Sequence, residues 1–123
     1  MKSNLFIDTN GIFREYHEME YITREDALYI AEERARLAGD KKLPLLIEFD
    51  ALKGFSPLTR DMPLEKILAN VSALAYYIDM NKESGKETRN QINLFFSITP
   101  WPIPVEIFHS EDDAIEWLKG YII

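Results

Sequence analysis

The sequence predicts an α/β protein with a mostly parallel mixed sheet, an N-terminal hairpin and helices packed on the sheet. An Asn-Gly turn near the start separates two short apolar segments, which is typical of a β-hairpin. A nearly continuous apolar run of strand length follows in the first half, as expected for a strand buried on both faces of a parallel sheet. Helical and strand periods then alternate, so we expect the order ββαβαββα with right-handed crossovers.

Size and composition favour one domain over residues 1–123. The 123 residues are 46% hydrophobic and 28% charged, which is ordinary for a globular chain. The formal net charge of -7 disfavours nucleic acid and anionic membrane surfaces as partners. No membrane-spanning run or signal peptide is visible, so we expect a soluble, cytoplasmic protein. With no cysteine and two histidines, we expect neither a metal site nor a cofactor.

The hairpin is expected to use residues 5–7 and 12–17 as strands around the Asn10-Gly11 turn. Alternation in the second strand is imperfect, because polar residues occur on both of its faces. This mixture favours a strand near a sheet edge, where it is available to pair with another copy. His17, at the end of this strand, is expected to be solvated.

A helix and a buried strand come next. Thr23 is placed to cap the helix, acidic residues occupy its first turn, and alanines recur at helical spacing. Gly39 is the expected stop. The apolar run Leu43–Phe49 predicts a strand, and Asp50 begins the loop that follows it.

The longest helix is expected to start near Pro63 and to end at Gly85, because apolar residues from Leu64 to Ile78 recur at steps of three and four. Residues 73–78 alone would also fit a strand, but the longer period favours the helix. Gly85 is the expected helix end, within a solvated connection over residues 82–89.

The last third is expected to hold two strands and a helix. Residues 92–98 alternate as a strand does, and residues 99–104 are too rich in proline for a regular helix. Val105–Phe108 predicts the last strand. Ser110 is expected to cap a final helix whose apolar face comprises Ala114, Trp117, Leu118 and Tyr121.

The order of elements, together with the strand Val105-Glu106-Ile107-Phe108 and the following Ala114-Ile115-Glu116-Trp117-Leu118, resembles the STAS or SpoIIAA-like family. Uncharacterised bacterial members have a strand that ends in Phe and a helix with Ala-x-x-Trp-Leu. The resemblance implies a small bacterial cytoplasmic module with a regulatory or binding role. The Asp-Ser-Ser-Gly-type phosphorylation motif of sporulation antagonists is absent, but Ser56 occupies a comparable place and is a candidate phosphorylation site.

Polar residues at strand ends suggest where a site would lie. In open parallel sheets, ligands bind beyond the carboxyl ends of the strands. The candidate ligand or partner site therefore contains the polar residues expected there and two loop aromatics: Asp50, Phe55, Ser56, Thr99, Trp101 and His109. The simpler interpretation is that these residues only begin or close loops, as polar residues do in any α/β fold.

Three functional hypotheses stay open. The first is a non-enzymatic regulatory or protein-interaction module that forms a homodimer, because the sequence shows no catalytic motif. The second is a small apolar ligand or lipid-binding domain, because the SpoIIAA-like fold resembles the CRAL-TRIO lipid carriers. Its pocket would be lined by Phe49, Phe55, Phe95, Phe96 and Trp101. The third and least favoured is an enzyme in which His109 and Asp50 share a proton.

Overall fold

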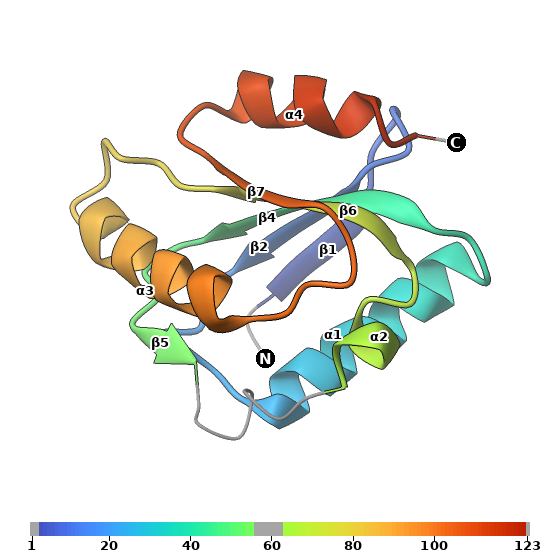
Figure 1. Ribbon diagram of the computed structural model, residues 1–123, viewed down its shortest axis with the longest axis horizontal. Helices are drawn as coiled ribbons and strands as arrows, with labels where there is room; N and C mark the ends of the chain where they lie inside the picture. The colour runs from blue at the N-terminus through green and yellow to red at the C-terminus, as the bar shows by residue number, and fades with distance from the viewer. Residues whose placement is uncertain (1–2, 56–62, 123) are drawn as a thin grey trace.

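The computed structural model describes residues 3–55 and 63–122. Within these residues a sheet of five strands has the order β1-β2-β4-β6-β7 (Figure 1). Only β1 is antiparallel to its neighbour, whereas β2, β4, β6 and β7 run parallel. The strands are β1 (Ser3–Ile7), β2 (Phe13–His17), β4 (Leu43–Phe49), β6 (Val71–Tyr77) and β7 (Val105–Phe108). The predicted fold class is therefore confirmed.

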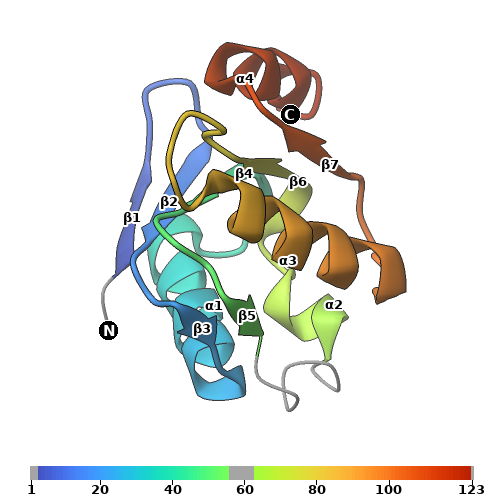
Figure 2. The same cartoon turned by 90° about the vertical axis from the view of Figure 1, so that its left-hand side faces the viewer.

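Helices cover both faces of this sheet. In the described part of the chain, α4 (Glu111–Lys119) lies on one face, and α1 (Arg24–Ala38), α2 (Leu64–Ile67) and α3 (Gly85–Ile98) lie on the other (Figure 1). Two short strands, β3 (Tyr21–Ile22) and β5 (Gly54–Phe55), pair in parallel near α1 and α3 (Figure 2). No helix within residues 3–55 or 63–122 combines the length and apolar character that crossing a membrane requires.

The N-terminal hairpin forms as predicted. The Asp8 carboxylate accepts hydrogen bonds from the backbone N–H groups of Asn10 (2.9 Å) and Ile12 (3.0 Å). Gly11 has φ of +80°, a conformation that glycine adopts without a steric penalty. The expectation that strand 12–17 lies near the sheet edge is wrong, because β2 is hydrogen-bonded on both sides and β1 is the edge strand.

The boundaries of α1 also agree with the prediction. The Thr23 hydroxyl accepts from the Asp26 N–H (3.1 Å), and the Asp26 carboxylate accepts from the Thr23 N–H (3.0 Å). This reciprocal pair satisfies two N–H groups that the helix leaves free. Gly39 ends the helix with φ of +64°.

The long helix expected from near Pro63 to Gly85 is wrong. The structure has only the four-residue α2 there, followed by strand β6. Leu74 and Tyr76 pack on the α1 side of the sheet, and Ala73 and Ala75 pack on the α4 side. Because both faces of β6 are buried, its apolar residues also fit steps of three and four. The period alone could not separate the two interpretations.

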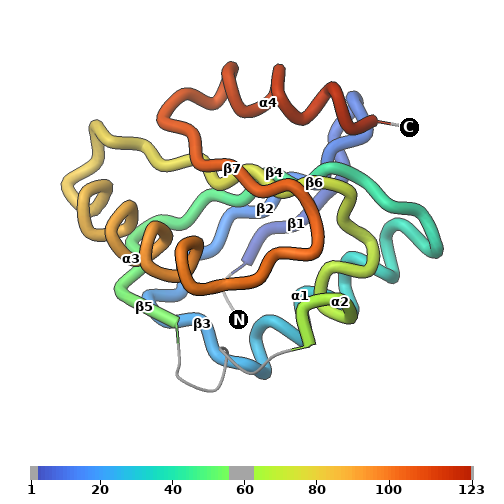
Figure 3. The backbone as a smooth tube through the Cα atoms, in the orientation of Figure 1, coloured from blue at the N-terminus to red at the C-terminus, as the bar shows by residue number. Residues whose placement is uncertain are grey.

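The strand expected over residues 92–98 is also wrong, because these residues belong to α3. Thr88 and Ile92 are buried at helical spacing, whereas Leu94 and Ile98 are 53% and 52% exposed. Gly85 starts this helix rather than ending one. It packs so closely that a Cβ there would lie 2.5 Å from the Asp79 carbonyl oxygen, which explains the need for glycine at this position. Figure 3 shows the chain running from β6 through α3 and back into β7. The segment expected to be a solvated connection thus forms the first turn of a helix.

The sheet separates two apolar cores. The larger core lies on the α1, α2 and α3 side and contains large side chains such as Phe13, Leu45, Phe49, Tyr76 and Ile92. The smaller core lies under α4 and consists of Ile12, Leu46, Ala73, Ala75, Ala114 and Leu118. As predicted, Ser110 caps α4, with its hydroxyl accepting from the Asp113 N–H at 3.3 Å.

Candidate functional site

Three ionisable side chains are buried together between β2 and α1. Glu15, His17 and Arg34 are 3%, 2% and 5% exposed. The two β2 residues share the face of Phe13, which points toward α1, and Arg34 lies on the buried face of that helix. Buried charges of this kind persist only when they are paired and hydrogen-bonded.

Hydrogen bonds join the cluster into a chain. Arg34 donates from Nε to Glu15 Oε2 (2.5 Å), from Nη2 to Glu15 Oε1 (3.0 Å), and from Nη1 to the Ile67 carbonyl (3.2 Å). Glu15 Oε1 also lies 2.9 Å from His17 Nε2, and His17 Nδ1 lies 2.7 Å from Ser3 Oγ. Since an ionised carboxylate only accepts, we assign a proton to Nε2; in the neutral ring, Nδ1 then accepts from the Ser3 hydroxyl.

Electrostatics favours the ionised form of this glutamate. Burial by itself would raise the pKa of Glu15, but the Arg34 guanidinium and the hydrogen bond from His17 outweigh burial and lower that pKa below its ordinary value. The cluster therefore holds a negative carboxylate against a positive guanidinium at neutral pH. On β6, which β4 separates from β2, burial raises the pKa of Tyr76 well above its ordinary value, so its hydroxyl stays protonated.

A cavity of about 80 Å³ adjoins this cluster. It lies between the sheet and the layer formed by α1, α2 and α3. Its described lining is mainly aliphatic and aromatic, and the polar side chains in it are His17, Arg34 and Tyr76. Four of the five aromatic residues expected to line a pocket do so, namely Phe49, Phe55, Phe95 and Trp101.

The aromatic side chains of the cavity pack on one another. The Phe55 and Phe95 rings are stacked with centroids 4.2 Å apart, and Trp101 meets Phe95 edge-on at 5.6 Å. Phe96, the fifth expected residue, contacts Trp101 but is not part of the described lining. The Trp101 indole N–H donates to the Phe96 carbonyl (3.2 Å), which ties the connection after α3 to that helix.

A second polar cluster lies at the carboxyl ends of β2 and β4. Asp50 Oδ1 accepts from the Tyr16 hydroxyl (2.9 Å) and from Lys82 Nζ (3.0 Å). The Ser84 hydroxyl donates to the Asp50 carbonyl (2.8 Å), which holds the start of α3 against this loop. The hydrogen bond from Lys82, followed by that from Tyr16, lowers the pKa of Asp50. All four groups are thus engaged with one another.

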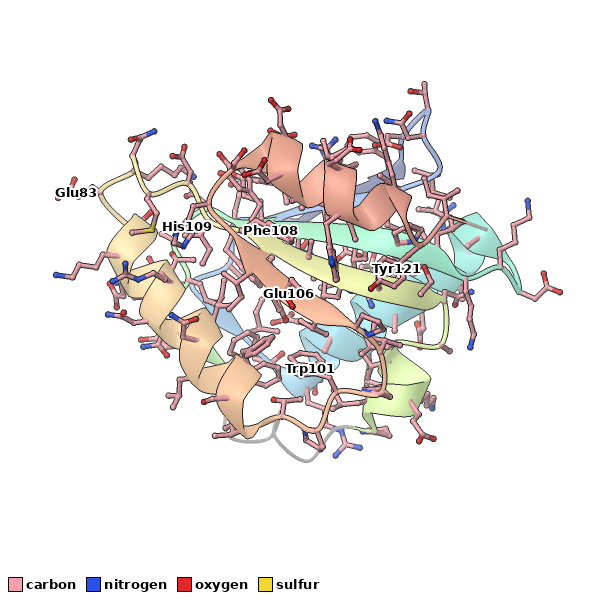
Figure 4. All side chains as sticks on the ribbon, turned by 45° about the horizontal axis from the view of Figure 1, so that its top comes forward. Glu83, Trp101, Glu106, Phe108, His109 and Tyr121 are labelled. Atoms are coloured by element: carbon pink, nitrogen blue, oxygen red, sulfur yellow. The ribbon has the colours of Figure 1, made fainter. Side chains whose placement is uncertain are left out.

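Of the predicted site residues, the structure brings Phe55 and Trp101 together in the cavity lining, but it does not bring the described polar ones together. Thr99 ends a helix rather than a strand, and its hydroxyl donates to the Phe95 carbonyl. His109 follows β7 and is exposed; Figure 4 shows it at the opposite end of that strand from Trp101. No hydrogen bond or ion pair joins His109 to Asp50 among the described residues. Ser56 lies outside the described residues.

Sequence reasoning missed the buried charged cluster. The expectation of a solvated His17 is wrong, because α1 covers one face of β2 and β1 lies along its side. One signal was present in the sequence: the alternation of β2 places Glu15 and His17 on the same face as the apolar Phe13. Arg34 also recurs with Ala27 and Ile30 at helical spacing on the buried face of α1.

Metal binding has no geometric support in residues 3–55 and 63–122. No group of three or more potential ligands converges in that part of the chain. The carboxylate most deeply buried, that of Glu15, is occupied by Arg34 and His17.

Comparison with known proteins gives a family and a fold. The model of a family described as a domain of unknown function, DUF7793, matches residues 5–122. No curated protein matches the sequence significantly. A crystal structure from Shewanella loihica PV-4, an uncharacterised DUF3478 protein with a SpoIIAA-like fold, is similar with a TM-score of 0.53 and 20% identity over 94% of this chain and 93% of that chain. This similarity confirms the SpoIIAA-like fold.

Proposed function

The chain belongs to the DUF7793 family, and we propose that it is a non-enzymatic regulatory module of the bacterial cytoplasm that binds protein, in the first place a second copy of itself. The observation that carries this proposal is the open edge of β1. No described segment pairs with the outer side of that strand. An uncovered edge presents unpaired backbone groups and invites another strand.

The direction of these backbone groups follows from the hairpin. The Asp8 N–H donates to the Ile12 carbonyl (2.9 Å), so this pair is of the hydrogen-bonded type. Pair types alternate along an antiparallel ladder, and the register joins Ile7 to Phe13. The N–H and C=O groups of Ser3, Leu5 and Ile7 therefore point outward. A two-fold related copy can pair with the same groups in antiparallel register.

The surface around this edge suits a second copy. β1 carries no charged side chain, although 28% of the chain is charged. Phe6 on β1 is 48% exposed, and Tyr29 of α1, beside Ser3 and Leu5, is 51% exposed. The net charge of -7 opposes association, but exposed charges are screened within about 8 Å at physiological salt. We therefore expect a dimer that dissociates less readily at higher salt.

Size-exclusion chromatography with light-scattering detection tests this proposal. We expect a mass of about twice 14.4 kDa for the unaltered chain. Phe6→Lys should yield a monomer, because an edge lysine blocks strand pairing. Leu94→Lys is the matched control, since Leu94 has similar exposure but lies on α3, and it should stay dimeric. A monomer at high protein concentration with and without salt, or equal dissociation of both variants, contradicts the proposal.

A second candidate function, binding of a small apolar molecule, is favoured by the cavity. The comparisons give no support to a CRAL-TRIO relationship, so this candidate depends on the aromatic lining alone. Cyclopentane is a suitable probe, and amide chemical shifts of the lining residues should change on titration. Ala27→Leu places a larger side chain in the cavity and should abolish the shifts, whereas Ala31→Leu, one turn further along α1 and not in the lining, should retain them. Absence of shifts in the unaltered protein rejects this candidate.

A further inference from the structure

The polar side of the cavity has a definite hydrogen-bonding character. Among its described lining residues, the side chains able to hydrogen-bond are those of His17, Arg34, Tyr76 and Trp101, and the Trp101 indole N–H already donates to the Phe96 carbonyl. Both ring nitrogens of His17 are already engaged, one with Glu15 and one with Ser3. Recognition of a ligand's polar atom is therefore left to Arg34 and Tyr76.

The acceptors of the cluster are used within it. Glu15 Oε1 contacts both His17 Nε2 and Arg34 Nη2, and Glu15 Oε2 accepts from Arg34 Nε. Arginine has five N–H donors, and three of them are engaged with Glu15 and the Ile67 carbonyl. A ligand on this side of the cavity thus meets Arg34 N–H groups that are free to donate, whereas the oxygens of the Glu15 carboxylate already accept hydrogen bonds.

With the neutral ring of His17 assigned above, the charges of the cluster are also balanced. The Arg34 guanidinium is neutralised by the Glu15 carboxylate, whose pKa is lowered by that contact despite its burial. An ammonium ligand would find no free carboxylate, and a carboxylate ligand would find no uncompensated cation. Burying an unpaired charge in an apolar cavity is expensive. The site therefore disfavours both ions.

We propose that this cavity recognises small, neutral, largely apolar molecules that carry one acceptor oxygen, such as a ketone or aldehyde carbonyl, with Tyr76 as the donor. This inference rests on the second candidate function above. The Tyr76 hydroxyl remains a donor at neutral pH, because burial keeps it protonated. The Phe49 and Trp101 rings pack against Tyr76 and hold its side chain at the cavity wall.

Cavity size limits the probe. An engineered cavity of about 150 Å³ accommodates benzene, and a saturated five-membered ring has a similar volume. A cavity of about 80 Å³ therefore accepts such a ring only when the lining side chains move outward, so we choose probes no larger than this. Four probes share such a ring and differ in their polar group: cyclopentanone, cyclopentane, cyclopentylammonium and cyclopentanecarboxylate. Titrations followed by amide chemical shifts at neutral pH compare them on the intact chain.

The decisive variant is Tyr76→Phe, which keeps the ring and removes the donor. We expect cyclopentanone and cyclopentane to bind the unaltered protein and neither ion to bind. Tyr76→Phe should weaken cyclopentanone about fivefold, the usual effect of one hydrogen bond, and leave cyclopentane within about twofold. The carbonyl ¹³C resonance of bound cyclopentanone should also move toward its value in an apolar solvent.

The possible outcomes distinguish failure of the proposed preference for an acceptor oxygen from failure of apolar binding in the cavity. If cyclopentane binds but Tyr76→Phe leaves the affinity for cyclopentanone unchanged, Tyr76 is not the donor and the proposal is overturned, whereas apolar binding stands. Binding of cyclopentylammonium or cyclopentanecarboxylate as tight as that of cyclopentanone also overturns the preference. If no probe binds the unaltered protein, the preference and the second candidate function fail together. Ala27→Leu should abolish all binding, and Ala31→Leu should preserve it.

Discussion

The two faces of the sheet are built from different side chains. Under α4, the fully buried core is composed of small and aliphatic residues, including Ala73, Ala75 and Ala114, and partly buried aromatic side chains pack around it. On the opposite face, the fully buried core itself contains phenylalanine and tyrosine rings, and it adjoins a buried ion pair and a cavity of about 80 Å³. The same strands contribute to both faces, because successive side chains of a strand point in opposite directions.

This difference assigns close packing to the α4 face of the sheet and space for a ligand to the α1 face. Alanines on two facing elements allow a nine-residue helix to lie close to the sheet with little side-chain entropy lost. Large rings cannot fill the space under three helices as completely, and they leave room beside polar groups. The α4 face is therefore expected to tolerate little change in volume, and the α1 face is expected to tolerate more.

The largest effect should come from breaking the buried ion pair. Arg34→Met leaves Glu15 charged and without its partner, and should lower the free energy of unfolding by about 3–5 kcal/mol. Arg36→Met, on the same helix, removes an exposed pair with Glu33 and should cost less than about 0.5 kcal/mol. Urea unfolding measures both. Similar losses in the two variants would show that burial does not distinguish the pairs.

Acidification should weaken the same pair. The folded pKa of Glu15 lies below its ordinary value of 4.5, so the stability it contributes is present above that value and is lost as pH falls below it. Urea unfolding between pH 7 and pH 3 follows this loss. The double variant Glu15→Gln/Arg34→Met keeps an acceptor for His17 and should show a shallower decline. An equally steep decline would assign the acid sensitivity to other carboxylates.

Overpacking should distinguish the two faces directly. Ala114→Leu adds volume to a fully buried position under α4 and should cost about 1–3 kcal/mol. Ala27→Leu adds the same atoms beside the cavity and should cost less than about 1 kcal/mol, because the cavity receives them. Thermal or urea unfolding of the two variants gives the comparison. A larger loss for Ala27→Leu would contradict the difference in packing between the faces.

The helix caps should give the smallest effects. Thr23→Ala removes one half of the reciprocal cap of α1 and should cost about 1 kcal/mol. Ser110→Ala removes a single, longer hydrogen bond of 3.3 Å at α4 and should cost about 0.5 kcal/mol. Equilibrium unfolding in urea measures the free energy of unfolding of both variants. If Ser110→Ala cost more, α4 would depend on its cap rather than on its packing.

Local signals determined several elements without any tertiary information. The Asn-Gly turn predicts the hairpin, Thr23 and Ser110 predict two helix starts, and the run Leu43–Phe49 predicts a buried strand. Each of these depends on interactions between residues close in sequence, or on a composition that only a buried strand has. The prediction of fold class depended on such local patterns, whereas the four aromatic residues that line the cavity come from separate elements that only the fold brings together.

Only the tertiary structure decided residues 64–98 and the buried charges. An apolar strand covered on both faces satisfies a helical period as well as a strand period, so β6 became a strand because β4 and β7 lie beside it. Likewise, Glu15 and Arg34 are 19 residues apart, and their burial is stable only because β2 and α1 bring opposite charges together. Pairing between distant segments leaves no period in the sequence.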